Sequence, residues 1–211
     1  DPKAGLTFDS VLSFILGRDP NIHRDPSVIL VEEIRDAETA NIAIRVVETG
    51  HLVLSTLHRK DAVSAVNHLF RLGIAPDLIA SNLLGVIAQR LVRKICPQCK
   101  IPYIPDKREL RSLGLNNGQK SPHIYCKGTG CSDCGHTGYS GQIGLFEMFA
   151  PTEQLRTELA KRPTKPWLVR LAREAGMKTI LEDGIAKIRQ GITTIEDQAK
   201  QRLQVLNQGH L

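Results

Sequence analysis

A strand, helix, strand, helix rhythm in the first third of the chain constrains the fold more than any other feature. Val28–Val31 form an apolar run with no polar face, as in a strand buried on both faces of a parallel sheet. A helix is predicted from an N-cap at Asp36 to a left-handed stop at Gly50. A second apolar strand is predicted from His51 to Leu57, and another helix from Asp61 to Phe70. This alternation is typical of parallel sheets, so we predict an α/β fold.

Acidic and imidazole side chains follow the two predicted strands. Glu32 and Glu33 end the first apolar run, and His58 lies just past the second. Open α/β sheets bind ligands at the carboxyl ends of their strands, where a carboxylate can hold Mg²⁺ or an attacking water. A solvent-exposed acidic turn is the alternative interpretation. The sequence has no GxxxxGK[ST] phosphate-binding loop, so the chain is either not a nucleotide enzyme or a piece of one.

Two CxxC pairs are the strongest local signal for a metal. Four thiolates in two such pairs can surround one metal ion tetrahedrally, and a loop-rich segment with few apolar residues gains its order from that ion. The predicted ligands of a structural zinc are Cys96, Cys99, Cys131 and Cys134. A redox CxxC or an iron site is the alternative. Cys126 is the odd thiol, and His123 and His136 are possible substitute ligands.

Composition narrows the classes of partner. Lys and Arg outnumber Asp and Glu by 28 to 22, so a negatively charged partner such as a nucleotide, nucleic acid or anionic lipid fits the charge. Aromatic residues make up only 4% of the chain, which disfavours a stacking platform for single-stranded nucleic acid. Neither a membrane span nor a signal peptide is recognisable, so we expect a soluble, cytosolic protein.

The remaining segments divide between helices and a loop-rich insert. Residues 5–16 predict a short lead-in and one amphipathic helix with Thr7 or Asp9 as its cap, followed by a near-repeat around two Arg-Asp-Pro triplets that lengthens the next loop. A helix is expected from Pro76 through Ile87, and residues 89–95 are expected to form a strand. That strand contains three basic residues, Arg90, Arg93 and Lys94. They are expected to form a solvated face, and an anion-binding site is the alternative.

The second half of the chain is expected to be mostly helical. Residues 96–141 show little periodicity, and Ile143–Phe149 resemble a strand that returns to the parallel sheet. Helices are predicted over residues 152–161, 165–174 and 179–190. A last helix is predicted to open with a capping box from Thr193 to Glu196.

Five motifs in this order resemble the C-terminal half of the type II secretion and type IV pilus assembly ATPases. They are ILVEEIRDAETANIAI, TGHLVLSTLHRKDA, LLGVIAQRLVRKICPQC, GCSDCGHTGYSGQIGLFEM and AGMKTILEDGIAKIRQGITTIED. The resemblance implies a RecA-like P-loop core and a homo-hexameric motor that uses ATP and Mg²⁺. It also implies a location in the cytoplasm, peripheral to the inner membrane, docked on an inner-membrane platform protein. The tetracysteine module favours an assembly or secretion motor over a retraction motor.

The resemblance also assigns roles by position. Glu33 matches the catalytic Walker B glutamate, and Arg35 and Asp36 complete that motif. His51 and His58 match the two histidines of the His box, which would sense the γ-phosphate. The four cysteines of the CxxC pairs match the zinc ligands. The implied domains are residues 1–95 for the C-terminal part of the P-loop core, 96–142 for the zinc module, and 143–211 for a return strand and helical region.

Two residues near the expected nucleotide site depart from the family pattern. Glu32 stands where the family usually has glycine, and Gln142 stands where it has arginine. The phosphate-binding loop is expected upstream of this chain, so we expect the chain alone to be inactive and its parent to be a Mg²⁺-dependent ATPase. The alternatives are a non-catalytic docking subunit of the same machinery and a zinc-containing nucleic-acid binding module.

Overall fold

The computed structural model describes residues 27–114 and 124–207, which form two compact units. Of the described residues, unit 1 contains 27–59, 63–85 and 150–175, and unit 2 contains 60–62, 86–114, 124–149 and 176–207. The predicted lead-in and helix within residues 5–16, the two Arg-Asp-Pro triplets of the near-repeat, and His123 lie outside the described residues.

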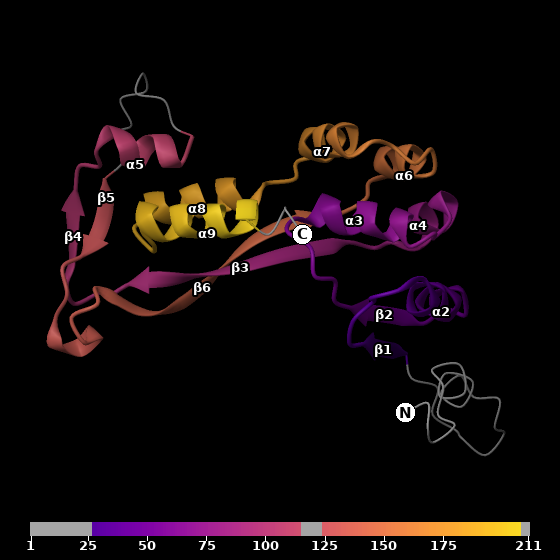
Figure 1. Cartoon of the computed structure of the whole chain (residues 1–211), viewed down its shortest axis with the longest axis horizontal. Coiled ribbons are helices and arrows are strands. Elements are labelled where there is room, and N and C mark those ends of the chain that lie inside the picture. Colours follow the sequence, from indigo (N-terminus) through magenta and orange to yellow (C-terminus); the bar gives the residue numbers. More distant parts are fainter. Residues whose placement is uncertain (1–26, 115–123, 208–211) are drawn as a thin grey trace, which may run out of the picture. The chain divides into compact units, whose positions relative to one another are not determined.

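Unit 1 is built on two parallel strands and a helix that covers one of their faces (Figure 1). Strands β1 (Val28–Val31) and β2 (Leu52–Ser55) pair in parallel, and α2 (Ala37–Glu48) connects them. The side chains of Ile29 and Val53 pack against buried Ile42 and Val46 of α2. The predicted parallel βαβ order is therefore confirmed at this point of the chain.

The opposite face of the β1–β2 sheet differs from the prediction of a strand buried on both sides. Its four apolar side chains are exposed to between 39% and 72%; they belong to Val28, Leu30, Leu52 and Leu54. The reason is that α2 packs only against the odd-numbered side chains of the two strands, and no described element covers the even-numbered ones.

The two ends of helix α2 follow the predicted capping residues. The carboxylate of Asp36 accepts a hydrogen bond from the amide of Thr39 at 2.8 Å, and Gly50 has a left-handed φ of +94°.

Helix α3 spans Ala62–Arg71, and α4 spans Pro76–Asn82. The predicted continuation of α4 to Ile87 is wrong, because the chain turns after Asn82 and enters a strand. Helices α6 (Glu153–Leu159) and α7 (Lys165–Glu174) complete the unit.

Unit 2 is organised by a long antiparallel ribbon (Figure 1). Strand β3 (Val86–Ile95) pairs with β6 (Tyr139–Phe149), with Ala88 opposite Glu147 and Arg93 opposite Gln142. The prediction that residues 143–149 return to the parallel sheet is therefore wrong. These residues pair with β3 because the cysteine-bearing segment between the two strands acts as the loop of one extended hairpin.

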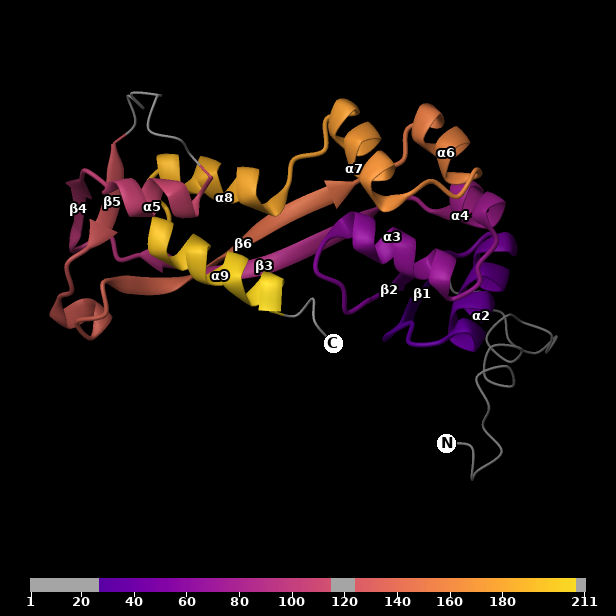
Figure 2. The same ribbon diagram turned by 45° about the horizontal axis from the view of Figure 1, so that its top comes forward.

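The hairpin loop is more regular than its sequence predicts. Strands β4 (Lys100–Tyr103) and β5 (Tyr125–Gly128) pair antiparallel, α5 spans Lys107–Ser112, and a short 3₁₀ turn η2 spans Ser132–Cys134. Helices α8 (Ile180–Arg189) and α9 (Ile195–Asn207) lie along the ribbon and beside α5 (Figure 2). A buried cluster joins the loop to these helices; its members are Leu113, Tyr125, Ile188 and Ile195.

The start of α9 lies one residue later than the predicted capping box. The Thr194 hydroxyl accepts a hydrogen bond from the amide of Asp197, while Thr193 donates its hydroxyl to the carbonyl of Arg93. Within the described part of the chain, no helix combines the length and the apolar character that crossing a bilayer needs.

Candidate functional site

Glu33 and His58 meet beyond the carboxyl ends of the two parallel strands. Glu33 Oε1 lies 3.4 Å from His58 Nε2, and its Oε2 accepts a hydrogen bond from Arg35 Nε at 2.5 Å. The Glu33 side chain is only 14% exposed, whereas the His58 imidazole is 86% exposed. One carboxylate oxygen is thus held by a guanidinium and the other faces an accessible imidazole.

Thr56 ties the two strand ends together, a role that the sequence analysis missed. Its hydroxyl donates to the carbonyl of Glu32 at 2.5 Å, and its carbonyl accepts from the amide of Ile34 at 3.2 Å. These bonds bracket Glu33 on both sides, so they set where its carboxylate lies relative to the second strand. The sequence signal that could have indicated this role is a residue with a hydroxyl group near the end of a predicted strand.

The residues next to Glu33 in the predicted motif make different kinds of contact. Glu32 is exposed, and the structure uses its backbone carbonyl to join the strands. The hydrogen bond and charge of Glu33, with a smaller contribution from Glu32, raise the pKa of Arg35. Asp36 uses its carboxylate to cap α2, and the hydrogen bonds from Thr39 lower its pKa.

The two predicted His-box residues lie at opposite ends of β2. His51 precedes the strand, where its Nδ1 is 2.9 Å from the Thr49 hydroxyl. A strand of four residues, about 13 Å long at the usual rise per residue, separates it from the segment that leads to His58. Gln142 belongs to unit 2, where it faces Arg93 across the ribbon.

Arg59 links His58 to helix α3, and the sequence analysis did not anticipate this contact. One guanidinium nitrogen donates to the carbonyl of His58 at 3.1 Å, and another lies 2.7 and 2.8 Å from the two ring nitrogens of His68. Burial, followed by the positive charges of Arg59 and Arg71, lowers the pKa of His68. A neutral imidazole can accept a hydrogen bond from Arg59.

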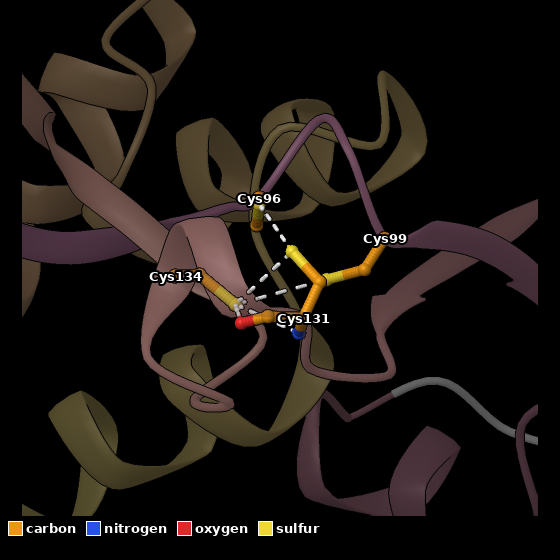
Figure 3. Close-up of side chains that lie close together, drawn as sticks. All are labelled: Cys96, Cys99, Cys131 and Cys134. Carbon is orange, nitrogen blue, oxygen red and sulfur yellow. Dashed lines mark hydrogen bonds between the residues drawn. The ribbon is translucent and has the colours of Figure 1, made fainter.

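The four CxxC sulfurs converge on one point (Figure 3). All four Sγ atoms lie within 4.8 Å of one another, and three pairs are separated by 3.7 to 3.9 Å. A zinc ion with Zn–S bonds of about 2.3 Å places tetrahedral thiolates about 3.8 Å apart. The residues that converge are those predicted from the spacing, namely Cys96, Cys99, Cys131 and Cys134. The donor set therefore fits a closed tetrahedral metal site.

Backbone amides point at the sulfurs. The amide of Gly130 lies 3.3 Å from Cys99 Sγ, and the amides of Cys131 and Gly138 lie 3.3 Å from Cys134 Sγ. The hydrogen bond from the Cys131 amide is the main cause that lowers the pKa of the Cys134 thiol to about 6. These donors favour the thiolate form that a metal requires.

Close backbone approach explains two glycines in the cysteine loops. A Cβ added to Gly128 would lie 2.0 Å from the carbonyl oxygen of Gly138, and one added to Gly138 would lie 2.7 Å from that of Gly128. The two segments can therefore pass each other only without side chains. Cys126 and His136 do not belong to the metal-ligating group that the described residues form.

The sequence matches a known protein family along most of its length. The sequence model described as "Type II/IV secretion system protein" matches residues 1–200. The type IV pilus assembly ATPase PilB of Thermus thermophilus is 42% identical over 197 residues, which are 93% of this chain and 22% of that protein. The type II secretion system ATPase E of Vibrio cholerae is 44% identical over 197 residues, which are 93% of this chain and 37% of that protein.

Solved structures share the fold. The pilus retraction motor PilT with bound ADP superposes with a TM-score of 0.61 at 23% identity, covering 92% of this chain and 43% of that one. The Legionella pneumophila ATPase DotB gives a TM-score of 0.55 at 21% identity, covering 87% of this chain and 40% of that one. The chain thus spans less than half the length of each of these relatives.

Proposed function

Because the chain belongs to the type II/IV secretion system protein family, we propose that it is part of an ATPase that powers type II secretion or type IV pilus assembly. The observation that carries this proposal is the pairing of Glu33 with His58 at the carboxyl ends of adjacent parallel strands. Relatives of 42% and 44% identity that are named ATPases of these systems support it.

In the proposed reaction, Glu33 is the catalytic base. Its Oε1, which lies 3.4 Å from His58 Nε2, would orient and deprotonate the water that attacks the γ-phosphate. Arg35 holds Oε2, so the carboxylate keeps one orientation. His58, exposed and next to Glu33, would donate a hydrogen bond to the γ-phosphate.

The other proposed site residues have supporting roles. Glu32 would approach the Mg²⁺ that accompanies ATP, and Asp36 would keep the loop after Glu33 in place by capping α2. His51 and Gln142 are proposed to lie near the nucleotide in the assembled motor. The phosphate-binding loop would come from residues that precede this chain in its parent, so the chain alone would not turn over ATP.

The wider proposal concerns the parent protein and its surroundings. We infer a homo-hexamer in the cytoplasm, peripheral to the inner membrane and docked on the platform protein of the secretion or pilus system. Within this chain, residues 1–95 would complete the ATPase core, residues 96–142 would form the zinc module, and residues 143–211 would supply the C-terminal helices and, instead of a return strand, the partner strand of β3.

Substitution of Glu33 tests the catalytic assignment. In the full-length protein, Glu33→Gln should lower the ATP turnover number by about a hundredfold or more, because the amide cannot accept the proton of the attacking water. The matched control is Glu38→Gln, which makes the same change at an acidic residue in the first turn of α2. It should leave turnover unchanged. Unaltered turnover in a folded Glu33→Gln protein would favour the non-catalytic docking subunit instead.

The four-cysteine centre is proposed to hold one structural zinc. Zinc would supply four bonds that hold the two CxxC turns of the hairpin loop together, and a closed tetrahedral site leaves no position for a substrate. Metal analysis of the purified protein should give one zinc per chain. Cys99→Ser should lose it, whereas Cys126→Ser should retain it; loss in both variants, or in neither, would contradict this ligand set.

A further inference from the structure

His58 lies in a tight turn that is hydrogen-bonded to the rest of unit 1 on both sides. Before the turn, the two bonds of Thr56 hold the end of β2 against the end of β1. Within the turn, the amide of Arg59 donates to the carbonyl of Leu57 at 2.9 Å, so the backbone bends at His58. After the turn, the Arg59 side chain provides a further connection.

The Arg59 guanidinium bridges this turn and helix α3. Its Nη1 donates to the carbonyl of His58 at 3.1 Å, and its Nη2 lies 2.8 Å from Nδ1 and 2.7 Å from Nε2 of His68. A guanidinium is planar and presents its donors in a fixed fork, so contacts from two of its nitrogens fix its orientation. All three residues belong to unit 1. The main chain of His58 is therefore held in place against α3.

His68 is suited to hold this guanidinium because its imidazole is neutral. Burial is the main cause that lowers the pKa of His68, and the positive charge of Arg59 is the next. A neutral imidazole keeps one ring nitrogen as an acceptor, whereas a protonated one has only donors. His68 is also half-buried, and a charge-assisted hydrogen bond is stronger there than on an exposed surface. His68 can therefore anchor Arg59 at neutral pH.

We propose that Arg59 is a positioning residue for ATP turnover, anchored by His68, and that it keeps the imidazole of His58 beside Glu33. Because that imidazole is 86% exposed, its place 3.4 Å from Glu33 Oε1 depends mainly on the main chain that carries it. Arg59 acts on that main chain and not on the nucleotide. The proposal rests on the proposed function, because the place of His58 affects turnover only if Glu33 acts on ATP.

A double-mutant cycle in the full-length protein tests the link between Arg59 and His58. Arg59→Ala should lower kcat about tenfold, the usual effect of losing one charge-assisted hydrogen bond. When His58 is already alanine, adding Arg59→Ala should change kcat by less than about twofold, because its effect passes through His58. Effects of the two substitutions that simply multiply would overturn the proposal.

Conservative substitutions distinguish the fork of the guanidinium from its charge. Arg59→Lys keeps the charge and should recover little of the lost kcat, because an ammonium group has only one nitrogen to offer two partners. His68→Ala should reproduce the loss seen in Arg59→Ala, whereas His68→Gln keeps an acceptor and should recover most of it. Full turnover in His68→Ala would contradict the anchoring role.

Arg156→Ala is the matched control. Arg156 is also an arginine of unit 1 whose guanidinium donates to main-chain carbonyls, those of Ala80 at 2.5 Å and Ser81 at 3.2 Å in α4. The substitution therefore measures the general cost of removing such a guanidinium. Its effect on kcat, if any, should multiply with that of His58→Ala.

Hydrogen exchange gives a readout independent of turnover. Peptides spanning residues 57–60 should exchange about tenfold faster in Arg59→Ala, because the turn loses its bond to α3, and should stay unchanged in Arg156→Ala. Unchanged exchange in Arg59→Ala would refute the inference even if Glu33→Gln abolishes turnover. Should Glu33→Gln leave turnover intact, the proposed function fails, and the exchange result still decides whether Arg59 holds this turn.

Discussion

Arg93 and Asp197, 104 residues apart in sequence, are joined by three hydrogen bonds. One oxygen of Asp197 accepts from the backbone amide of Arg93 at 2.6 Å, and the other accepts from two guanidinium nitrogens at 2.8 and 2.6 Å. The guanidinium also stacks on the ring of Tyr139 at 3.8 Å. Asp197 therefore fastens the start of α9 to both strands of the ribbon, and it raises the pKa of Arg93.

Removing Asp197 should destabilise unit 2. Asp197→Ala leaves a backbone amide and a guanidinium without their acceptor, which should lower the free energy of unfolding by about 2 to 4 kcal/mol. Glu196→Ala, the neighbouring residue whose pair with Lys200 is more than half exposed, should cost less than about 0.5 kcal/mol. Urea titration followed by circular dichroism measures both, and equal losses would contradict a special role for Asp197.

Gly128 should be required for metal binding. A methyl group there would lie 2.0 Å from the carbonyl oxygen of Gly138, so Gly128→Ala should push apart the two ends of the loop that carries Cys131 and Cys134. We expect zinc affinity to fall by at least about tenfold, measured by competition with a chromogenic chelator. Gly135→Ala, where an added Cβ meets no atom within 4 Å, should bind zinc more tightly than Gly128→Ala despite its left-handed φ of +57°.

His68 should make stability dependent on pH. Its pKa in the folded protein is lower than the ordinary value of 6.5, so the unfolded chain binds more protons than the folded chain in the window below that value. The contribution of His68 to the free energy of unfolding is therefore fully present above about pH 6.5, and it is lost as the pH falls through the lowered pKa. Urea titrations between about pH 5 and pH 8 should show this slope. His68→Gln, which retains an acceptor for Arg59, should flatten it; an unchanged slope would assign the effect elsewhere.

Gln142→Arg should weaken the ribbon. The new guanidinium would face Arg93 directly across the strands, and like charges at opposed positions are destabilising by up to about 1 kcal/mol. Gln142→Leu removes the amide without adding charge and serves as the control. Thermal unfolding at low and at high salt distinguishes the two, because only the charge effect should diminish as salt increases.

Local signals in the sequence predicted the elements whose stability is local. Asp36 and Gly50 delimit α2 because a cap and a left-handed stop act on neighbouring residues. The two cysteines of each CxxC pair are likewise close in sequence, so their spacing alone predicts that they can share a metal ion. Pairing partners were harder to predict. The apolar pattern of residues 143–149 suits a parallel or an antiparallel neighbour equally, so only the three-dimensional structure identifies β3 as the partner.

The site was predictable in its residue types and not in its supports. Glu33 and His58 stand out at strand ends, whereas Thr56 and Arg59 act through contacts that no periodicity reveals. The cap of α9 illustrates the same limit. Thr193 and Thr194 are adjacent, and a distant partner, the carbonyl of Arg93, decides which hydroxyl remains to cap the helix.

The four cysteines lie at the base of the β3–β6 hairpin, which has a consequence for folding kinetics. Cys96 follows the last residue of β3, and Cys134 comes shortly before the first residue of β6. Without a metal, the strands must find each other across the whole connecting segment, and closing a long loop costs chain entropy before any pairing rewards it. A metal bound first would turn that search into the closure of a tight turn, so the refolding rate of the ribbon should rise with zinc concentration.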